Sequence, residues 1–220
     1  MIQAEFVRSN RARLSESVQL QLFQLPRRRE LLLRHLGPPP QRVLDAGCAT
    51  GYVAALLHRL GHDVTGIELN SAMAAQARAH GVRVLEHDLE EPLPLPDQCM
   101  DAAHVCEVIE HLFDTEGFLR EIHRLLVPGG LLILSTPNLN SLANRIRVLC
   151  GRPLPMWGAF PDDRHGTHVR VLNKAKIVEL LDRTGFQVVG LEGINLSRVG
   201  KLMDRAPCWS EMLLVRAERV

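Results

Sequence analysis

Apolar and polar residues follow two alternating patterns along most of this chain. Short apolar runs are typical of strands that are buried on both faces of a sheet. Between them lie amphipathic segments that begin at capping residues such as Asn or Asp and end at Gly, as helices do. The pattern predicts strands over 43–46, 64–67, 82–86, 100–106, 131–135, 186–191 and 212–215, and helices over 51–60, 71–80, 115–126, 138–150 and 173–184. Repeated strand–helix alternation indicates an α/β fold with a parallel sheet and right-handed crossovers.

The first forty residues stand apart from this alternation. Residues 18–36 carry leucines at helical spacing, Pro26 can begin a second helix there, and Gly37 with prolines 38–40 stops it. We therefore expect an N-terminal helical appendage over 1–40 and one α/β domain over 41–220. A length of 220 residues suits one domain with an appendage.

A turn of small residues follows the first predicted strand, where residues 45–51 read DAGCATG. Small residues let the backbone approach a ligand closely, and the N-terminus of the next helix offers N–H groups to it. Glu68 ends the second strand, where a carboxylate can accept both hydroxyl groups of a ribose. A dinucleotide fingerprint starting at Gly47 would need glycine where the chain has Ala49 and Tyr52. The pattern therefore disfavours a dinucleotide.

This turn resembles the first motif of the class I S-adenosylmethionine-dependent methyltransferases, D-x-G-x-G-x-G, with alanine at the middle glycine. The resemblance continues over about residues 40–217. Glu68 matches the family's ribose-binding acid, and residues 87–89 match its adenine-binding motif. Residues 128–131 match the turn before the family's fifth strand. It implies a Rossmann-like three-layer sandwich, a seven-stranded, mostly parallel sheet with the last strand antiparallel, and S-adenosylmethionine as cofactor. The cofactor-binding residues that it implies are Asp45, Gly47, Cys48, Ala49, Gly51, Glu68, Leu69, Asp88, Leu89 and Cys106.

Some of these acids also fit plainer interpretations. Asp88 lies among Glu86, Glu90 and Glu91, as in a solvated acidic loop. Asp45 also fits a structural role in bracing the glycine turn, which is compatible with contact to the amino-acid end of the cofactor.

A second group of ionisable residues follows the fourth predicted strand, where residues 106–112 read CEVIEHL. If a helical turn begins there, Glu107, Glu110 and His111 lie at i, i+3 and i+4 on one face. Two carboxylates and an imidazole at this spacing can hold a divalent metal. Residues 84–119 contain ten acids and no Lys or Arg, so a cation would relieve repulsion there. Alternatively, Glu107 braces the turn, Glu110 is solvated and His111 is a substrate-side hydrogen-bonding residue.

The E-x-x-E-H string is similar to that of ubiquinone-biosynthesis O-methyltransferases and of small-RNA 2′-O-methyltransferases, in which the matching residues are taken to hold Mg²⁺ near the acceptor hydroxyl. The resemblance implies a metal set of Glu107, Glu110, His111 and a later histidine, His168, with His165 as its neighbour. It also implies catalytic roles for Glu107 and His111. Because related methyltransferases without an established metal share the string, a metal-free mechanism in which His111 accepts the hydroxyl proton stays open.

The resemblance fades over 151–170 and 195–210, which we expect to be substrate-side loops. Met156, Trp157 and Phe160 lie among prolines and fit an apolar lid or, equally, a satellite hydrophobic cluster. The net charge of +1 combines eight arginines and three acids in 1–42 with an excess of acids afterwards. That acidic part, with an aromatic content of 4%, disfavours a nucleic-acid partner.

Neither a secretory signal nor an apolar run of the roughly 20 residues that a membrane span needs is evident, so we expect a cytoplasmic protein. The five cysteines lack the spacing of a zinc site or a disulfide framework. The sequence therefore predicts an enzyme that transfers a methyl group from S-adenosylmethionine to a hydroxyl of a small molecule, lipid or saccharide. The alternatives are a metal-dependent RNA ribose 2′-O-methyltransferase and a cofactor-binding partner protein that has lost catalysis. The oligomeric state is not indicated.

Overall fold

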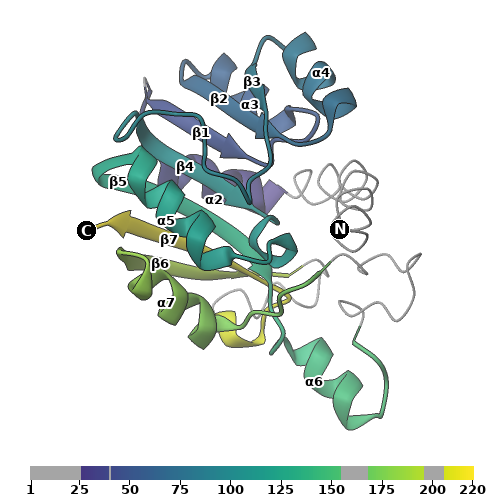
Figure 1. Cartoon of the computed structure of the whole chain (residues 1–220). Coiled ribbons are helices and arrows are strands. Elements are labelled where there is room, and N and C mark those ends of the chain that lie inside the picture. The colour runs from purple at the N-terminus through teal and green to yellow at the C-terminus, as the bar shows by residue number, and fades with distance from the viewer. Residues whose placement is uncertain (1–25, 40, 155–167, 196–205) are drawn as a thin grey trace.

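The computed structural model describes residues 26–39, 41–154, 168–195 and 206–220. These residues form a seven-stranded sheet in the order β3-β2-β1-β4-β5-β7-β6 (Figure 1). The strands β3, β2, β1, β4 and β5 are parallel, whereas β7 is antiparallel to both of its neighbours. The predicted α/β sheet with an antiparallel last strand is confirmed. The strands are β1 (Arg42–Ala46), β2 (Asp63–Glu68), β3 (Arg83–Glu86), β4 (Met100–Cys106), β5 (Leu126–Pro137), β6 (Phe186–Ile194) and β7 (Met212–Arg219).

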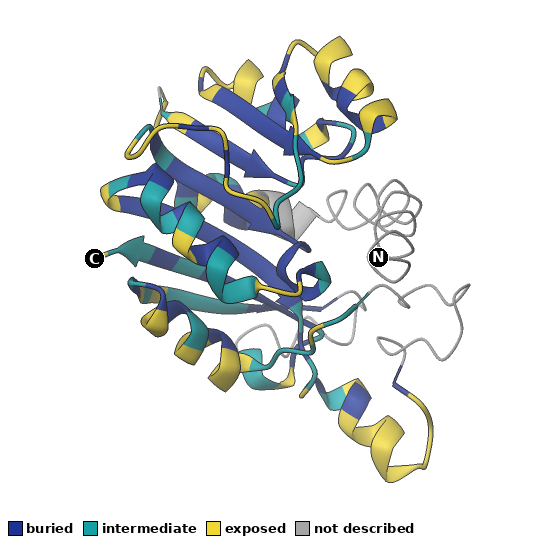
Figure 2. Ribbon diagram, viewed as in Figure 1, coloured by how far each residue is buried: buried dark blue, intermediate teal, exposed yellow. Residues whose placement is uncertain are grey.

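Helices cover both faces of the sheet and complete three layers (Figures 1 and 2). On one face, a buried cluster joins the sheet to α2 (Pro26–Leu36), α3 (Tyr52–Arg59) and α4 (Ser71–Ala79). On the other face, a second cluster joins it to α5 (Thr115–Leu125) and α7 (Lys174–Arg183). A further helix, α6 (Leu142–Leu149), extends away from the sheet in Figure 1. The short 3₁₀ turns η1 (Ile109–His111) and η3 (Pro207–Trp209) follow β4 and precede β7.

Three helices begin where the sequence predicts a capping side chain. Asn70 accepts hydrogen bonds from the backbone N–H groups of α4, at 2.9 and 3.1 Å. Asp114 accepts from the first turn of α5 at 2.8 Å, and Asn173 from that of α7 at 3.0 Å. Each cap satisfies N–H groups that have no partner within the helix, so local chemistry sets these boundaries.

Two elements begin at least four residues away from the predicted position, and β6 and β7 extend beyond their predicted ends. β5 begins at Leu126 instead of residue 131, because Leu126 pairs with Met100 directly after α5 ends. The register then shifts, and the Pro-Gly-Gly segment is an irregularity within β5 rather than a turn before it. α6 begins at residue 142 rather than 138, because the buried Asn138 side chain donates to the Ser210 carbonyl at 2.8 Å and fixes a turn there.

The N-terminal segment contributes to the core of the sheet. Leu31, Leu32 and Leu36 of α2 are buried in the same cluster as Val43 and Ile133. The domain boundary at residue 40 stays a prediction. Residues 155–167 and 196–205, which include most of the expected substrate-side loops, the aromatic segment and His165, lie outside the described residues. Among the helices that the structure describes, none is long and apolar enough to cross a membrane.

Candidate functional site

The carboxyl ends of β3, β2, β1 and β4 lie next to one another along one edge of the sheet. Because these strands are parallel, the segments that follow them meet at that edge, which is where open α/β sheets bind ligands. The segments are residues 47–51 after β1, Leu69 after β2, 87–89 after β3 and 107–111 after β4. Asp45, Glu68 and Cys106 lie at or next to the ends of the same strands. The fold thus brings all the expected cofactor-binding residues to one edge.

Hydrogen bonds to β2 hold the glycine turn in place. The N–H groups of Gly47 and Cys48 both donate to the Ile67 carbonyl, at 2.9 and 3.0 Å. Gly47, Ala49 and Gly51 have φ angles of 72°, 48° and 77°, in the left-handed region that favours glycine. Ala49 therefore carries a strain of about 1–2 kcal/mol that glycine at this position would avoid.

Two glycines of the turn are required by close packing. A Cβ atom on Gly51 would lie 2.5 Å from the Cβ of Ala77 on α4, and one on Gly47 would lie 2.8 Å from a methyl group of Val108. The turn therefore forms a backbone cradle without side chains at these two positions, between α4 and the segment after β4.

Glu68 joins the glycine turn to the start of α4. One carboxylate oxygen, Oε2, accepts from the Ala49 N–H at 2.9 Å, and Oε1 accepts from the Asn70 N–H at 2.8 Å. Burial raises the pKa of Glu68, and the backbone hydrogen bonds oppose that rise. An ionised carboxylate has about four acceptor positions, more than these backbone donors fill, so capacity remains for donors such as ribose hydroxyls.

The remaining cofactor candidates differ in exposure. Leu69 is 38% exposed and offers an apolar surface beside Glu68, whereas Leu89 packs against the larger core cluster. Asp88 is half-buried, and its Oδ1 accepts from the Glu90 N–H at 3.1 Å. The Cys48 side chain packs against β2, where a Cβ on Gly66 would lie 2.6 Å from its sulfur. Cys48 therefore helps to pack the turn, and burial raises the pKa of its thiol.

Sequence reasoning missed a buried partner of Asp45. His104 on β4 is in register with Asp45 on β1, and its Nδ1 lies 2.7 Å from Asp45 Oδ1. Burial disfavours a charge on His104, but Cys106 and Asp45 outweigh it and raise the pKa of His104 to about 10. The second carboxylate oxygen, Asp45 Oδ2, is buried with no partner among the described residues. A histidine within an apolar strand was the available signal, but its partner depends on the register between strands.

The segment after β4 does not begin as a helix. Glu107 has a φ of 57°, its N–H donates to the Ser135 carbonyl at 3.0 Å, and its Oε1 accepts from Ser135 Oγ at 2.7 Å. The helical turn expected from Glu107 is therefore wrong, since only Ile109–His111 forms a 3₁₀ turn. Glu107 is fixed on β5 instead of sharing a helical face with Glu110 and His111.

Glu110, His111 and His168 do come together. One potential ligand atom from each residue lies within 4.8 Å of the other two. The imidazole rings of His111 and His168 meet edge to face at 4.8 Å, and His111 Nε2 lies 4.0 Å from Glu110 Oε1. The N–H groups of Val169 and Arg170 donate to the Glu110 carbonyl at 2.9 and 3.0 Å, which brings His168 beside the turn. This group contains three of the four expected metal ligands and not Glu107.

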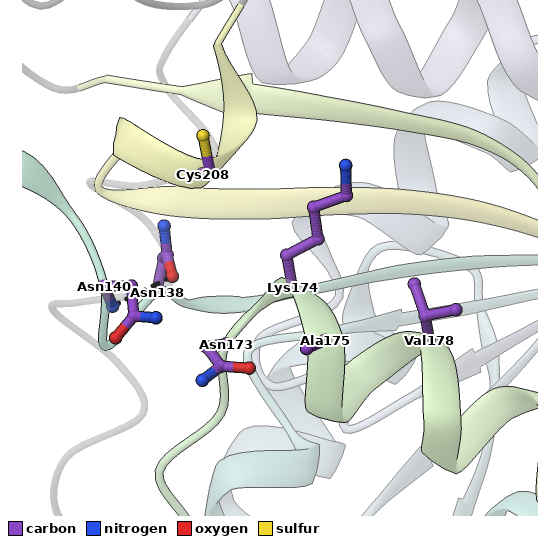
Figure 3. Close-up of a pocket in the computed structure, with 7 residues that line it drawn as sticks. All are labelled: Asn138, Asn140, Asn173, Lys174, Ala175, Val178 and Cys208. Atoms are coloured by element: carbon purple, nitrogen blue, oxygen red, sulfur yellow. Dashed lines mark hydrogen bonds between the residues drawn. The ribbon is translucent and has the colours of Figure 1, made fainter.

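A pocket of about 400 Å³ lies where β5 ends, beside the start of α7 and η3 (Figure 3). Three carboxamides gather in it, and Cys208 of η3 lies across from the two asparagines of the turn after β5. The lining residues are Asn138, Asn140, Asn173, Lys174, Ala175, Val178 and Cys208. The pocket therefore offers hydrogen-bonding groups and one cation beside a small apolar wall.

Comparisons with known proteins point to one family. A family model described as "Methyltransferase domain" matches residues 14–191. A probable S-adenosylmethionine-dependent methyltransferase of Mycolicibacterium smegmatis is 38% identical over 153 residues, which is 69% of this chain and 54% of the relative. A ubiquinone biosynthesis O-methyltransferase of Ruegeria pomeroyi is 31% identical over 69% of this chain and 62% of the relative. The chain therefore spans little more than half the length of these curated relatives.

A solved structure has the same fold. The crystal structure of an S-adenosylmethionine-dependent methyltransferase from Mesorhizobium loti superimposes with a TM-score of 0.65 at 24% identity. The match covers 86% of this chain and 95% of that one. At this identity the likeness concerns the fold alone.

Proposed function

Because the chain belongs to the class I S-adenosylmethionine-dependent methyltransferase family, we propose that it transfers the methyl group of S-adenosylmethionine to an oxygen acceptor. The acceptor in this proposal is a hydroxyl group of a small molecule, lipid or saccharide. One observation carries it: the glycine turn, Glu68 and residues 87–89 meet at the sheet edge that also holds Glu110 and His111. The name of the Ruegeria pomeroyi relative, an O-methyltransferase, supports an oxygen acceptor.

The residues at this edge fit the cofactor. The glycine turn has no side chain at Gly47 and Gly51, so its backbone can lie close to a ligand. Asp45 Oδ2 is a buried acceptor that no donor among the described residues reaches, and an ammonium group is a suitable donor. In this proposal Glu68 receives the ribose hydroxyls, Asp88 the adenine amino group and Asp45 the amino-acid end. S-adenosylmethionine, when bound, supplies an electrophilic methyl group on a sulfonium.

The chain's own residues then have to align the acceptor and take its proton. His111 is placed for this role, because its side chain is 26% exposed at the sheet edge. The buried carboxylate of Glu110 lies 4.0 Å from His111 Nε2, where it can stabilise the positive charge that the imidazole gains. Exclusion of water and alignment of the acceptor supply the rest of the rate enhancement.

A second role for this group is supported by its geometry. One carboxylate and two imidazoles can hold a divalent cation, which lowers the pKa of a bound hydroxyl. A metal with bonds of about 2.0–2.2 Å needs ligand atoms roughly 3–3.5 Å apart, so the group must contract by about an ångström. Two imidazoles favour Zn²⁺ over Mg²⁺, which prefers oxygen ligands.

Chelation separates the two roles of His111. Under the metal role, exhaustive chelation abolishes methyl transfer and one of Mg²⁺, Mn²⁺ or Zn²⁺ restores it. His168→Ala then loses the response to metal, since His168 is a ligand in that role only. Activity that survives chelation, with His168→Ala close to the wild type, supports the proton-accepting role alone.

The acceptor is proposed to reach the pocket of Figure 3. Asn173 of the pocket is the fifth residue after His168, so their Cα atoms are at most roughly 18 Å apart. Leu172, next to Asn173, accepts at its carbonyl from the Leu139 N–H at 2.8 Å, which ties this segment to the end of β5. Asn138 already donates both amide hydrogens, so the Asn140 and Asn173 carboxamides and Lys174 are left for an acceptor with several hydroxyl groups.

Methyl transfer with labelled S-adenosylmethionine and a panel of hydroxylated small molecules, lipids and saccharides tests the function. For an acceptor that is methylated, the KM is then measured in Ala175→Trp, whose side chain fills the pocket. Lys176→Trp, on the same exposed turn of α7, is the control. We expect the KM for the acceptor to rise at least tenfold in Ala175→Trp only. Binding of S-adenosylhomocysteine without transfer to any acceptor favours a cofactor-binding partner protein over an enzyme.

A further inference from the structure

His104 lies in the sheet directly beside Asp45. The two residues are register partners on the parallel strands β1 and β4, so their side chains extend from the same face of the sheet. Their side chains meet through His104 Nδ1 and Asp45 Oδ1, 2.7 Å apart, and both residues are buried, at 5% and 2% exposure. Charged groups this deeply buried are rare unless they are paired.

The pair leaves one oxygen without a partner. Asp45 Oδ2 has no hydrogen-bond partner within the described residues, although nearly all buried polar atoms have one. Asp45 is the second residue before Gly47, where the cofactor turn begins. A ligand bound at this turn with a cationic end would supply such a donor.

The electrostatics of His104 agree with this geometry. Burial opposes a charge on its ring, whereas the neighbouring Cys106 and Asp45 raise the pKa of His104. A protonated imidazole donates from Nδ1 and offsets the cost of burying the Asp45 carboxylate. Asp45 Oδ1 is thereby occupied, and the carboxylate cannot turn to use both oxygens within the sheet.

We propose that His104 is a positioning residue that fixes Asp45 so that Oδ2 receives the ammonium group of the cofactor's amino-acid end, directly or through one bound water. The proposal rests on the proposed function, because it assumes that S-adenosylmethionine binds at the glycine turn. It adds that recognition of the amino-acid end depends on a residue of β4 that lies behind Asp45.

Calorimetry with two ligands tests the proposal without turnover. S-adenosylhomocysteine carries the amino-acid end, and 5′-methylthioadenosine lacks it. His104→Leu removes the donor to Asp45, whereas His104→Asn keeps an N–H near the position of Nδ1. We expect His104→Leu to weaken S-adenosylhomocysteine binding roughly 10–100-fold, as for loss of a charged hydrogen bond, and to change methylthioadenosine binding less than twofold. His104→Asn should recover most of the loss.

Two further variants keep the test decisive. His62→Leu removes another buried histidine, next to the end of α3, and should leave the ratio of the two affinities unchanged. Asp45→Asn should lower the affinity for S-adenosylhomocysteine relative to that for 5′-methylthioadenosine, as His104→Leu does. If His104→Leu does not fold, Asp45→Asn takes its place in the test.

The outcomes also separate the proposal from the function on which it rests. Suppose that the wild type binds S-adenosylhomocysteine. An equal loss of affinity for both ligands in His104→Leu then overturns the role of His104, and so does an unchanged ratio of the two affinities in Asp45→Asn. A wild type that binds neither ligand overturns the proposed function and the proposal together.

Discussion

Gly51 is a position where both the backbone angle and the close packing of α4 exclude a side chain. Its φ of 77° is left-handed, and a Cβ atom there would lie 2.5 Å from the Cβ and 2.7 Å from the Cα of Ala77. The second contact is with backbone, so a rotamer change cannot relieve it. Gly51→Ala therefore has to push α3 and α4 apart or distort the cofactor turn.

The expected cost has two parts. The left-handed backbone costs alanine about 1–2 kcal/mol. Overpacking adds about 1–3 kcal/mol. Gly129 provides the matched control, because its φ of 72° is also left-handed but no atom of the described residues lies within 4 Å of a Cβ built there. Gly129→Ala should therefore lose only the first part.

Urea denaturation of the two variants and the wild type measures the difference. We expect Gly51→Ala to lose about 2 kcal/mol more of the free energy of unfolding than Gly129→Ala, equivalent to roughly 4–8 °C in Tm at this chain length. S-adenosylhomocysteine binding should also weaken in Gly51→Ala and not in Gly129→Ala. Equal losses of stability in both variants would refute the packing of α3 on α4 at Gly51.

Three other predictions follow from single contacts. Asp114→Ala should lower the free energy of unfolding by about 1 kcal/mol, because the cap on the Gly117 N–H is lost. Asp114→Asn, which keeps a capping oxygen, should not. Equal urea midpoints for the two variants would contradict this. The raised pKa of His104 stabilises the folded state fully below about pH 6.5, and this contribution is lost as the pH rises through about 10. The fall in unfolding free energy across that window should thus be smaller in His104→Asn, and an identical fall would count against the buried pair. His111→Ala should lower turnover roughly 10²–10⁴-fold with an unchanged Kd for S-adenosylhomocysteine; unchanged turnover would remove His111 from the mechanism.

Much of the fold was accessible from the sequence because its signals are local. Asn70, Asp114 and Asn173 each cap a helix through atoms two or three residues away, so a pattern in one short segment is enough to locate the boundary. The glycine turn likewise depends on backbone angles that small residues permit.

The site itself depends on contacts between distant segments. Glu107 takes a left-handed backbone that no local pattern indicates, and its carboxylate is held by Ser135, 28 residues away. Asp45 and His104 are 59 residues apart, and only the register of β1 on β4 brings them together. Periodicity identifies a strand but says nothing of its register, which is why His104 was missed. The helical face at Glu107 was wrong because the backbone angle at that residue depends on its contact with the distant Ser135.

We propose that the edge formed by β3, β2, β1 and β4 binds S-adenosylmethionine through the glycine turn and Glu68. Calorimetric titration with S-adenosylhomocysteine and with NAD, on the wild type and on Glu68→Gln, tests it most directly. We expect the wild type to bind S-adenosylhomocysteine and not NAD, and Glu68→Gln to weaken this binding at least tenfold. Binding of NAD in place of S-adenosylhomocysteine, or an undiminished affinity in Glu68→Gln, would contradict it.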